Sequence, residues 1–128
     1  MKISRERFDE MVVHEEEDLM ARLPQELREA AQDLLIEIKD RPTPDDVGDF
    51  DLEPGETLYG AYLGVSLVER RADDVLLAPS QVWLFAEPIC ASGRTEFEVR
   101  SQIRRTLLHE VAHHFGMSEE ELERRGRG

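Results

Sequence analysis

The apolar residues near the C-terminal end of the chain repeat with the period of an α-helix. Thr95 and Glu98 form a capping-box pattern for its start, and Gly116 is typical of a helix end. At about 100° per residue, one broad arc between these signals collects the apolar side chains Val99, Ile103, Leu107, Leu108, Val111 and Phe115. The pattern therefore predicts an amphipathic helix with one side in the core.

Three histidines fall on this helix, and they do not share one environment. His109 and His113 lie outside the apolar arc, four residues apart and so one turn apart on nearly the same face. His114 lies in the middle of the arc, which predicts a buried, hydrogen-bonded core histidine. Gln102 and Arg105 lie close to the face of His109 and His113. They either line a cleft there or are ordinary surface residues, and the second interpretation is favoured.

The N-terminal third of the chain has helical patterns with clear start signals. Ser4 is suited to cap a helix that runs to about Leu23. Its apolar side comprises Phe8, Met11, Val12, Leu19 and Met20. Pro24 suits the first turn of a second helix, from Gln25 to about Asp33. Residues 34–39 alternate weakly and predict either a strand or a continuation of that helix.

Two later segments have strand patterns. Residues 58–63 predict a strand in which Gly60 allows a close approach of backbone. Residues 82–86 predict the strongest strand, and Pro88 suggests that it lies at a sheet edge. Proline, glycine and acidic residues predict a loop over residues 41–57, and a short helical turn is expected near residues 67–72. This order predicts one α+β domain over residues 1–128, with a small mixed or antiparallel sheet packed on helices.

Composition and charge narrow the function classes. The chain has 128 residues and a net charge of −13, which argues against nucleic acid or an anionic membrane as a partner. No apolar run approaches the roughly 20 residues of a membrane span, and the N-terminus lacks the apolar core of a signal peptide. Cys90 is the single cysteine. A buried thiol on a strand and a cytoplasmic location are the expectations.

The residues His109, Glu110 and His113 form an H-E-x-x-H pattern. Two imidazoles one turn apart can share one Zn²⁺ at Zn–N distances of about 2.0–2.1 Å. Glu110 lies about 100° around the helix from His109, where its carboxylate can take a proton from water without binding the metal. The alternative is a pair of solvent-facing histidines.

A catalytic zinc usually has three protein ligands, so a third group is needed. Gly116 allows a sharp turn, and Ser118 with Glu121 forms a second capping box that predicts a short helix over residues 119–125. Glu119 lies at this turn and is the candidate third ligand, ahead of Glu120. The competing explanation is that acidic residues stabilise the first turn of any helix.

The stretch from His109 through Gly116, with Ser118 and an acid after it, resembles the minimal zincin-like metallopeptidases of bacteria. The resemblance extends upstream through residues 58–65, 82–85, 88–89 and 104–108. It implies that the two histidines bind the metal, that Glu110 is the general base, and that Glu119 stands where the family has Asp. It also implies an edge strand that binds extended peptide, with Phe85, Ala86 and Glu87 as the expected binding segment.

The resulting hypothesis is a cytoplasmic zinc peptidase with one Zn²⁺ per chain and a peptide or protein substrate. The alternative is a catalytically silent metal-binding or protein-interaction module on the same fold. A weaker idea is an acidic surface that binds a basic partner in a salt-sensitive way. Tyr59 and Tyr62 either donate to an oxyanion or serve packing, and nothing in the sequence selects between these roles.

Overall fold

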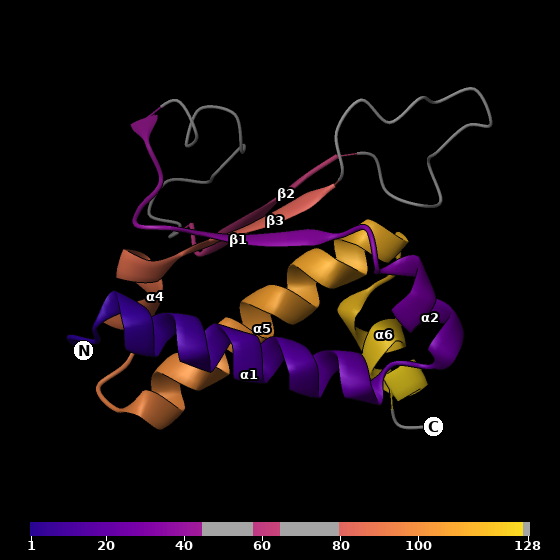
Figure 1. The fold of residues 1–128 in the computed structure, drawn as a ribbon, viewed down its shortest axis with the longest axis horizontal. Coiled ribbons are helices and arrows are strands. Elements are labelled where there is room, and N and C mark those ends of the chain that lie inside the picture. Colours follow the sequence, from indigo (N-terminus) through magenta and orange to yellow (C-terminus); the bar gives the residue numbers. More distant parts are fainter. Residues whose placement is uncertain (45–57, 65–79, 127–128) are drawn as a thin grey trace.

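The computed structural model describes residues 1–44, 58–64 and 80–126 (Figure 1). Its elements, in chain order, are α1 (Arg5–Arg22), α2 (Gln25–Ala30), β1 (Leu35–Lys39), β2 (Gly60–Leu63), β3 (Gln81–Phe85), α4 (Ala86–Ala91), α5 (Glu96–Phe115) and α6 (Glu119–Gly126). The expected helical turn at residues 67–72 and most of the loop at 41–57 lie outside the described residues.

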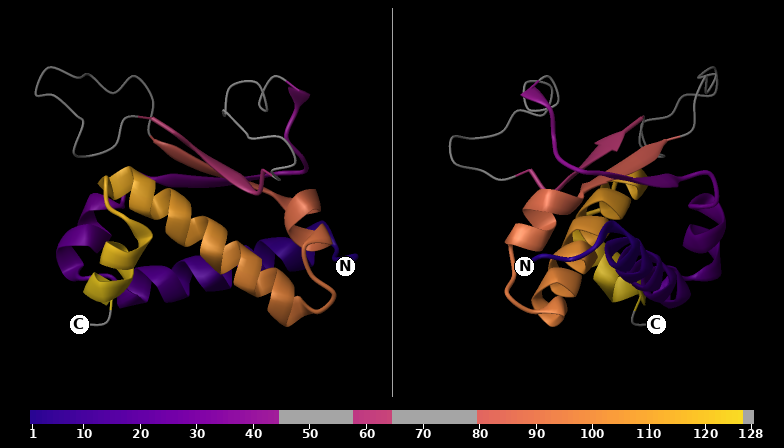
Figure 2. Two further views of the ribbon diagram at one scale, coloured as in Figure 1. Left: turned by 180° about the vertical axis from the view of Figure 1, so that it is seen from behind. Right: turned by 60° about the vertical axis from the view of Figure 1, so that its left-hand side comes forward.

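The three strands form a mixed sheet in the order β1-β3-β2. β1 runs parallel to β3, whereas β2 runs antiparallel to it. The helices α1 and α5 lie on one side of this sheet, and α6 follows at the C-terminal end of α5 (Figures 1 and 2). The α+β class with a small mixed sheet packed on helices is therefore confirmed.

The local signals of α5 act as the sequence predicts. The Thr95 hydroxyl accepts a hydrogen bond from the Glu98 amide at 3.2 Å, and Gly116 ends the helix with φ 68°, a left-handed conformation that favours glycine. The apolar arc is buried apart from the half-buried Leu108, with Val99, Ile103 and Val111 at 0% exposure. The predicted core side of this helix is confirmed.

The packing of α1 on α5 combines an apolar contact surface with one buried carboxylate. Phe8, Met11 and Val12 of α1 belong to the same core as the apolar side of α5. Glu15 is only 3% exposed, and the Arg104 guanidinium of α5 donates to its carboxylate at 3.0 Å. Because a buried carboxylate needs a partner, this pair links the two helices in addition to their apolar contact.

Several predicted boundaries shift in the structure. The helix α2 ends at Ala30 rather than near Asp33, and residues 35–39 form a strand, which decides between the two alternatives given above. Cys90 lies half-buried on α4, so its predicted place on a strand is wrong. The helices of residues 1–44, 58–64 and 80–126 include none with the length and apolar character of a membrane span.

The prediction of an edge strand at residues 82–86 is also wrong. β3 is the central strand, paired with β1 on one side and β2 on the other. Ala86 begins α4, and Pro88 lies in the first turn of that helix, where its missing amide hydrogen costs nothing. The sequence alone suggests, from Pro88, that the preceding strand lies at a sheet edge. In this chain Pro88 instead marks the first turn of a helix.

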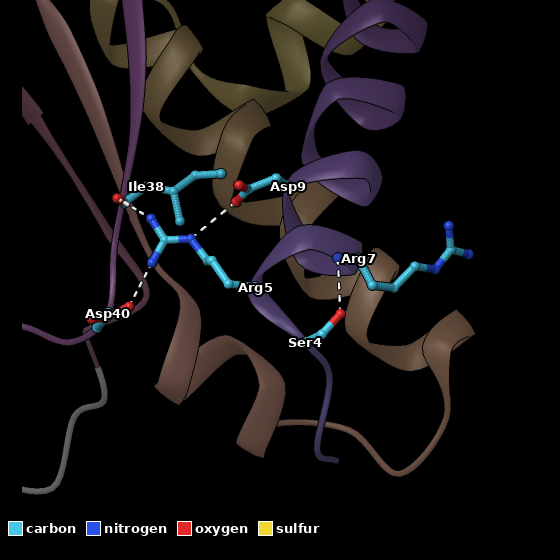
Figure 3. A network of polar contacts seen from close by, with 6 residues as sticks. All are labelled: Ser4, Arg5, Arg7, Asp9, Ile38 and Asp40. Carbon is cyan, nitrogen blue, oxygen red and sulfur yellow. Dashed lines mark hydrogen bonds and ion pairs between the residues drawn. The ribbon is translucent and has the colours of Figure 1, made fainter.

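One sheet edge is covered by a side chain from α1 (Figure 3). The Arg5 guanidinium donates to the Ile38 carbonyl of β1 at 2.6 Å and to the Asp40 carboxylate. Its Nε donates to Asp9 at 3.0 Å, so the guanidinium is held from two sides. A backbone acceptor at the outer side of β1 is thereby satisfied by an arginine.

Candidate metal centre

His109 and His113 occupy the last turns of α5 and are both exposed. They line one hollow of about 520 Å³ together with Gly116, Met117, Ser118 and Glu119. The helical spacing places both imidazoles on this side of α5, and the turn at Gly116 brings the start of α6 back against them. The structure thus brings together three of the predicted site residues, His109, His113 and Glu119.

Glu110 lies beside His109 but is shielded from water. The residue is 7% exposed, and its Oε1 is 3.8 Å from His109 Nε2. Burial raises the pKa of the Glu110 carboxyl above its ordinary value; the charge of His109 opposes this shift and the charge of Glu119 adds to it. A general base works best when its pKa approaches the working pH, so the direction of this shift suits the predicted role.

Glu119 is the first residue of α6 and contacts His109 directly. Its Oε1 is 2.5 Å from His109 Nδ1. The Ser118 hydroxyl accepts from the Glu121 amide at 3.1 Å, which confirms the predicted cap of this helix. A histidine that binds metal through Nε2 commonly gives its Nδ1 hydrogen to a carboxylate. In its present rotamer Glu119 therefore stands where it would orient His109.

The donor chemistry of this cluster suits zinc, because two imidazoles and a carboxylate are ligands that this ion takes. Among residues 1–44, 58–64 and 80–126, no three His, Cys, Asp or Glu side chains converge into a ready metal site. Glu119 lies on the Nδ1 side of His109, whereas Nε2 faces Glu110. For all three to bind one ion through His109 Nε2, the Glu119 side chain must rotate.

His114 is buried, as predicted from its place on the apolar arc, with 1% exposure. Its Nδ1 shares a hydrogen bond of 2.8 Å with the Tyr62 hydroxyl from β2. The Tyr62 ring also lies against His113, with ring centroids 4.7 Å apart. The sequence alone gives Tyr62 and Tyr59 the same two possible roles, an oxyanion donor or a packing residue. The pattern of nearby residues does not show which of the two tyrosines contacts α5.

Gln102 and Arg105 do not line the hollow. The Arg105 guanidinium donates to the Gln102 side-chain oxygen at 3.0 Å, and the Gln102 amide donates to the Thr106 hydroxyl at 3.1 Å. These contacts run along the surface of α5. The interpretation of both residues as ordinary helix-surface side chains therefore fits their positions.

The expected peptide-binding segment Phe85, Ala86 and Glu87 does not lie at a sheet edge. Phe85 is 0% exposed and its amide donates to the Tyr59 carbonyl at 2.9 Å, while the Glu87 amide donates to the Asp40 carbonyl at 2.8 Å. Backbone groups engaged in this way cannot pair with an added strand. The reason for expecting peptide at these three residues is therefore removed.

The strand beside His113 is β2. The Phe85–Tyr59 bond sets the alternation of the antiparallel pair, so Ala61 and Leu63 pair with β3, whereas Gly60 and Tyr62 direct their backbone groups away from it. At Gly60 the strand approaches α5 closely, because an added Cβ would lie 2.6 Å from Thr106 Cγ2. This confirms the predicted close approach at Gly60. No strand of the described segments pairs with the outer side of β2.

Comparisons with known proteins bear on this arrangement. A family model described as zincin-like metallopeptidase matches residues 31–128. Among solved structures, the chain is similar to a conserved hypothetical protein (TTHA0227) from Thermo thermophilus, with 21% sequence identity and a TM-score of 0.51. The alignment covers 95% of this chain and 99% of that one, and at this identity it shows the fold alone. A search of curated proteins found no match.

Proposed function

The chain belongs to the zincin-like metallopeptidase family, and from this premise we propose that it is a zinc-dependent peptidase. The observation that carries the proposal is the arrangement at the end of α5. Two exposed imidazoles one turn apart share a hollow with the carboxylate of Glu119, and the buried carboxylate of Glu110 lies beside the first of them.

In this proposal His109 and His113 hold the metal, and Glu119 is the third ligand after rotation away from His109 Nδ1. Zinc, when bound, supplies Lewis-acid chemistry that acidifies water and polarises a carbonyl. Glu110 takes a proton from the attacking water on its carboxylate and then gives it to the leaving amine of the cleaved peptide bond. Water is consumed, and one carboxylic acid and one amine are released.

We place the substrate along β2, replacing the earlier expectation for Phe85, Ala86 and Glu87. An extended peptide adds to a sheet edge through main-chain hydrogen bonds. Gly60 directs such groups away from β3 on the strand that approaches α5. A peptide bound there would run beside the helix that carries His113.

The first test is metal content by elemental analysis of the full chain, with a peptide-library cleavage assay. Wild type is expected to hold about one zinc, and His113→Ala to lose it. His14→Ala is the matched control, because His14 is an exposed histidine on α1. Glu110→Gln is expected to keep zinc and to lose hydrolysis by about 10²–10⁴-fold. Loss of zinc in Glu110→Gln would contradict the base assignment.

Glu119→Gln separates the two roles open to Glu119. A neutral amide is a poor zinc ligand but can still accept a hydrogen bond from His109 Nδ1. A large loss of zinc affinity would identify Glu119 as a ligand, and nearly unchanged affinity would identify it as the group that orients His109. Glu120→Gln is the control, since Glu120 is the adjacent exposed acid on the same helix.

A second candidate is a protein-interaction module on this fold that hydrolyses nothing. It is favoured by one observation, that the Glu119 carboxylate contacts His109 Nδ1 and not the side of His109 that bears Nε2. It predicts no cleavage of the peptide library and no zinc-dependent change upon His113→Ala. The two assays above therefore distinguish it from the peptidase.

A further inference from the structure

The ring of Tyr62 lies against two consecutive histidines of α5. Its centroid is 4.7 Å from that of His113, with 36° between the ring planes, and 5.5 Å from that of His114. Consecutive side chains on a helix diverge by about 100°. The ring that contacts both comes from another element, the strand β2.

Tyr62 is held firmly in this place. The residue is 8% exposed, and its strand pairs with β3, opposite Val82. Its hydroxyl shares a 2.8 Å hydrogen bond with His114 Nδ1, and His114 is itself 1% exposed on the core side of α5. The sheet and the core of α5 together fix the position of the ring.

His113, by contrast, is exposed in the last turn of its helix. An exposed side chain occupies several rotamers and loses that freedom when it binds a ligand. Ring pairs with centroids about 4.5–7 Å apart attract each other beyond simple burial. The Tyr62 ring therefore covers one side of the His113 imidazole and restricts its orientation.

We infer that Tyr62 is a positioning residue for His113, held in place by the buried His114. The inference rests on the proposed function, in which His113 is a metal ligand, and adds a residue that preorganises this ligand. It also assigns the Tyr62 hydroxyl to His114, so the ring rather than the hydroxyl serves the site. The oxyanion role considered for Tyr62 is thereby replaced.

The test compares Tyr62→Ile and Tyr62→Phe with the matched pair Tyr59→Ile and Tyr59→Phe. Zinc affinity is measured by competition with a chromophoric chelator, and Co²⁺ absorption reports the ligand geometry. Tyr62→Ile removes the ring and is expected to weaken zinc binding by about 10–100-fold, the range found for groups that orient metal ligands. It should also shift the Co²⁺ spectrum. Tyr62→Phe keeps the ring but loses the hydrogen bond to His114, so it should weaken binding by less than Tyr62→Ile does. Both Tyr59 variants should leave zinc affinity unchanged.

A readout without metal covers the case in which Tyr62→Ile does not fold. In the wild-type, metal-free protein, nuclear Overhauser effects are expected between the ring protons of Tyr62 and those of His113. Their absence would overturn the inference, as would unchanged zinc affinity in a folded Tyr62→Ile. If wild type binds no zinc at all, the proposed function fails and the inference fails with it. Zinc binding that is insensitive to Tyr62 refutes the inference alone.

Discussion

Within the described residues, the sheet ends in β1 on one side and in β2 on the other, and the two edges differ in what they offer a partner. At β1, the outward carbonyl of Ile38 accepts a hydrogen bond from Arg5, and Asp40 holds the same guanidinium. At β2, Gly60 and Tyr62 direct backbone groups away from the sheet, and the strand lies against the helix of the candidate metal centre.

The difference shows how the two edges of one small sheet can have different roles, with one edge protected against other chains and the other able to bind a peptide. Unpaired strand edges invite other chains, and proteins commonly block them with charged side chains. Arg5 of α1 blocks the edge formed by β1. In the contacts described here, this edge does not touch α5. At the other edge, Gly60 directs its backbone groups away from β3, on a strand that contacts α5 and His113. This contrast supports β2, rather than β1, as the strand that an extended substrate would join.

The largest expected effect comes from Gly60→Val, which would separate β2 from α5. An added Cβ lies 2.6 Å from Thr106 Cγ2 and 2.8 Å from the Trp83 carbonyl, so either the strand or the helix must shift. Overpacking of this kind costs about 1–3 kcal/mol, and we expect the upper part of that range in urea denaturation. Zinc affinity should fall as well, because Tyr62 would move away from His113.

The double variant Gly60→Val with Thr106→Ser is the control. The serine removes Cγ2 and retains the hydroxyl that donates to the Gln102 carbonyl at 2.7 Å. The double variant should recover only part of the lost stability, because the added Cβ would still lie too close to the Trp83 carbonyl. Wild-type stability in Gly60→Val would show that β2 does not lie against α5 as described.

An intermediate effect is expected in amide hydrogen exchange along β2. Ala61 and Leu63 pair with β3 and should exchange at least about 10-fold more slowly than Gly60, whose amide points away from β3. A bound peptide-like inhibitor should protect Gly60 but leave Ile36 and Ile38 of β1 unchanged. Protection of β1 residues instead would reverse the comparison of the two edges.

The smallest effect is expected from Arg5→Ala, which uncovers the edge of β1. The lost contacts are exposed ones, so the free energy of unfolding should fall by about 0.5–1 kcal/mol. Sedimentation should show more self-association, whereas zinc affinity should not change. Arg22→Ala is the matched control, because Arg22 pairs only with Asp18 on its own helix in the contacts described here. Equal self-association in both variants would contradict a special role for Arg5.

Features that depend on neighbours along the chain could be predicted from the sequence. The capped start of α5, its end at Gly116, its buried face and the burial of His114 all follow from helical period and local hydrogen bonding. The same holds for the placement of His109 and His113 on one exposed side of the helix. The cap at Ser118, which returns Glu119 to that side, is local as well.

Features that depend on pairing between distant segments were decided only by the tertiary structure. The sequence could not order the strands, and so it placed the edge at Phe85, Ala86 and Glu87, which are central or helical. It could not tell that Tyr62 rather than Tyr59 meets His113, that Arg104 pairs with Glu15, or that Arg5 covers Ile38. A local pattern fixes which face of an element is apolar, but the partner of that face is chosen by the packing of the whole chain.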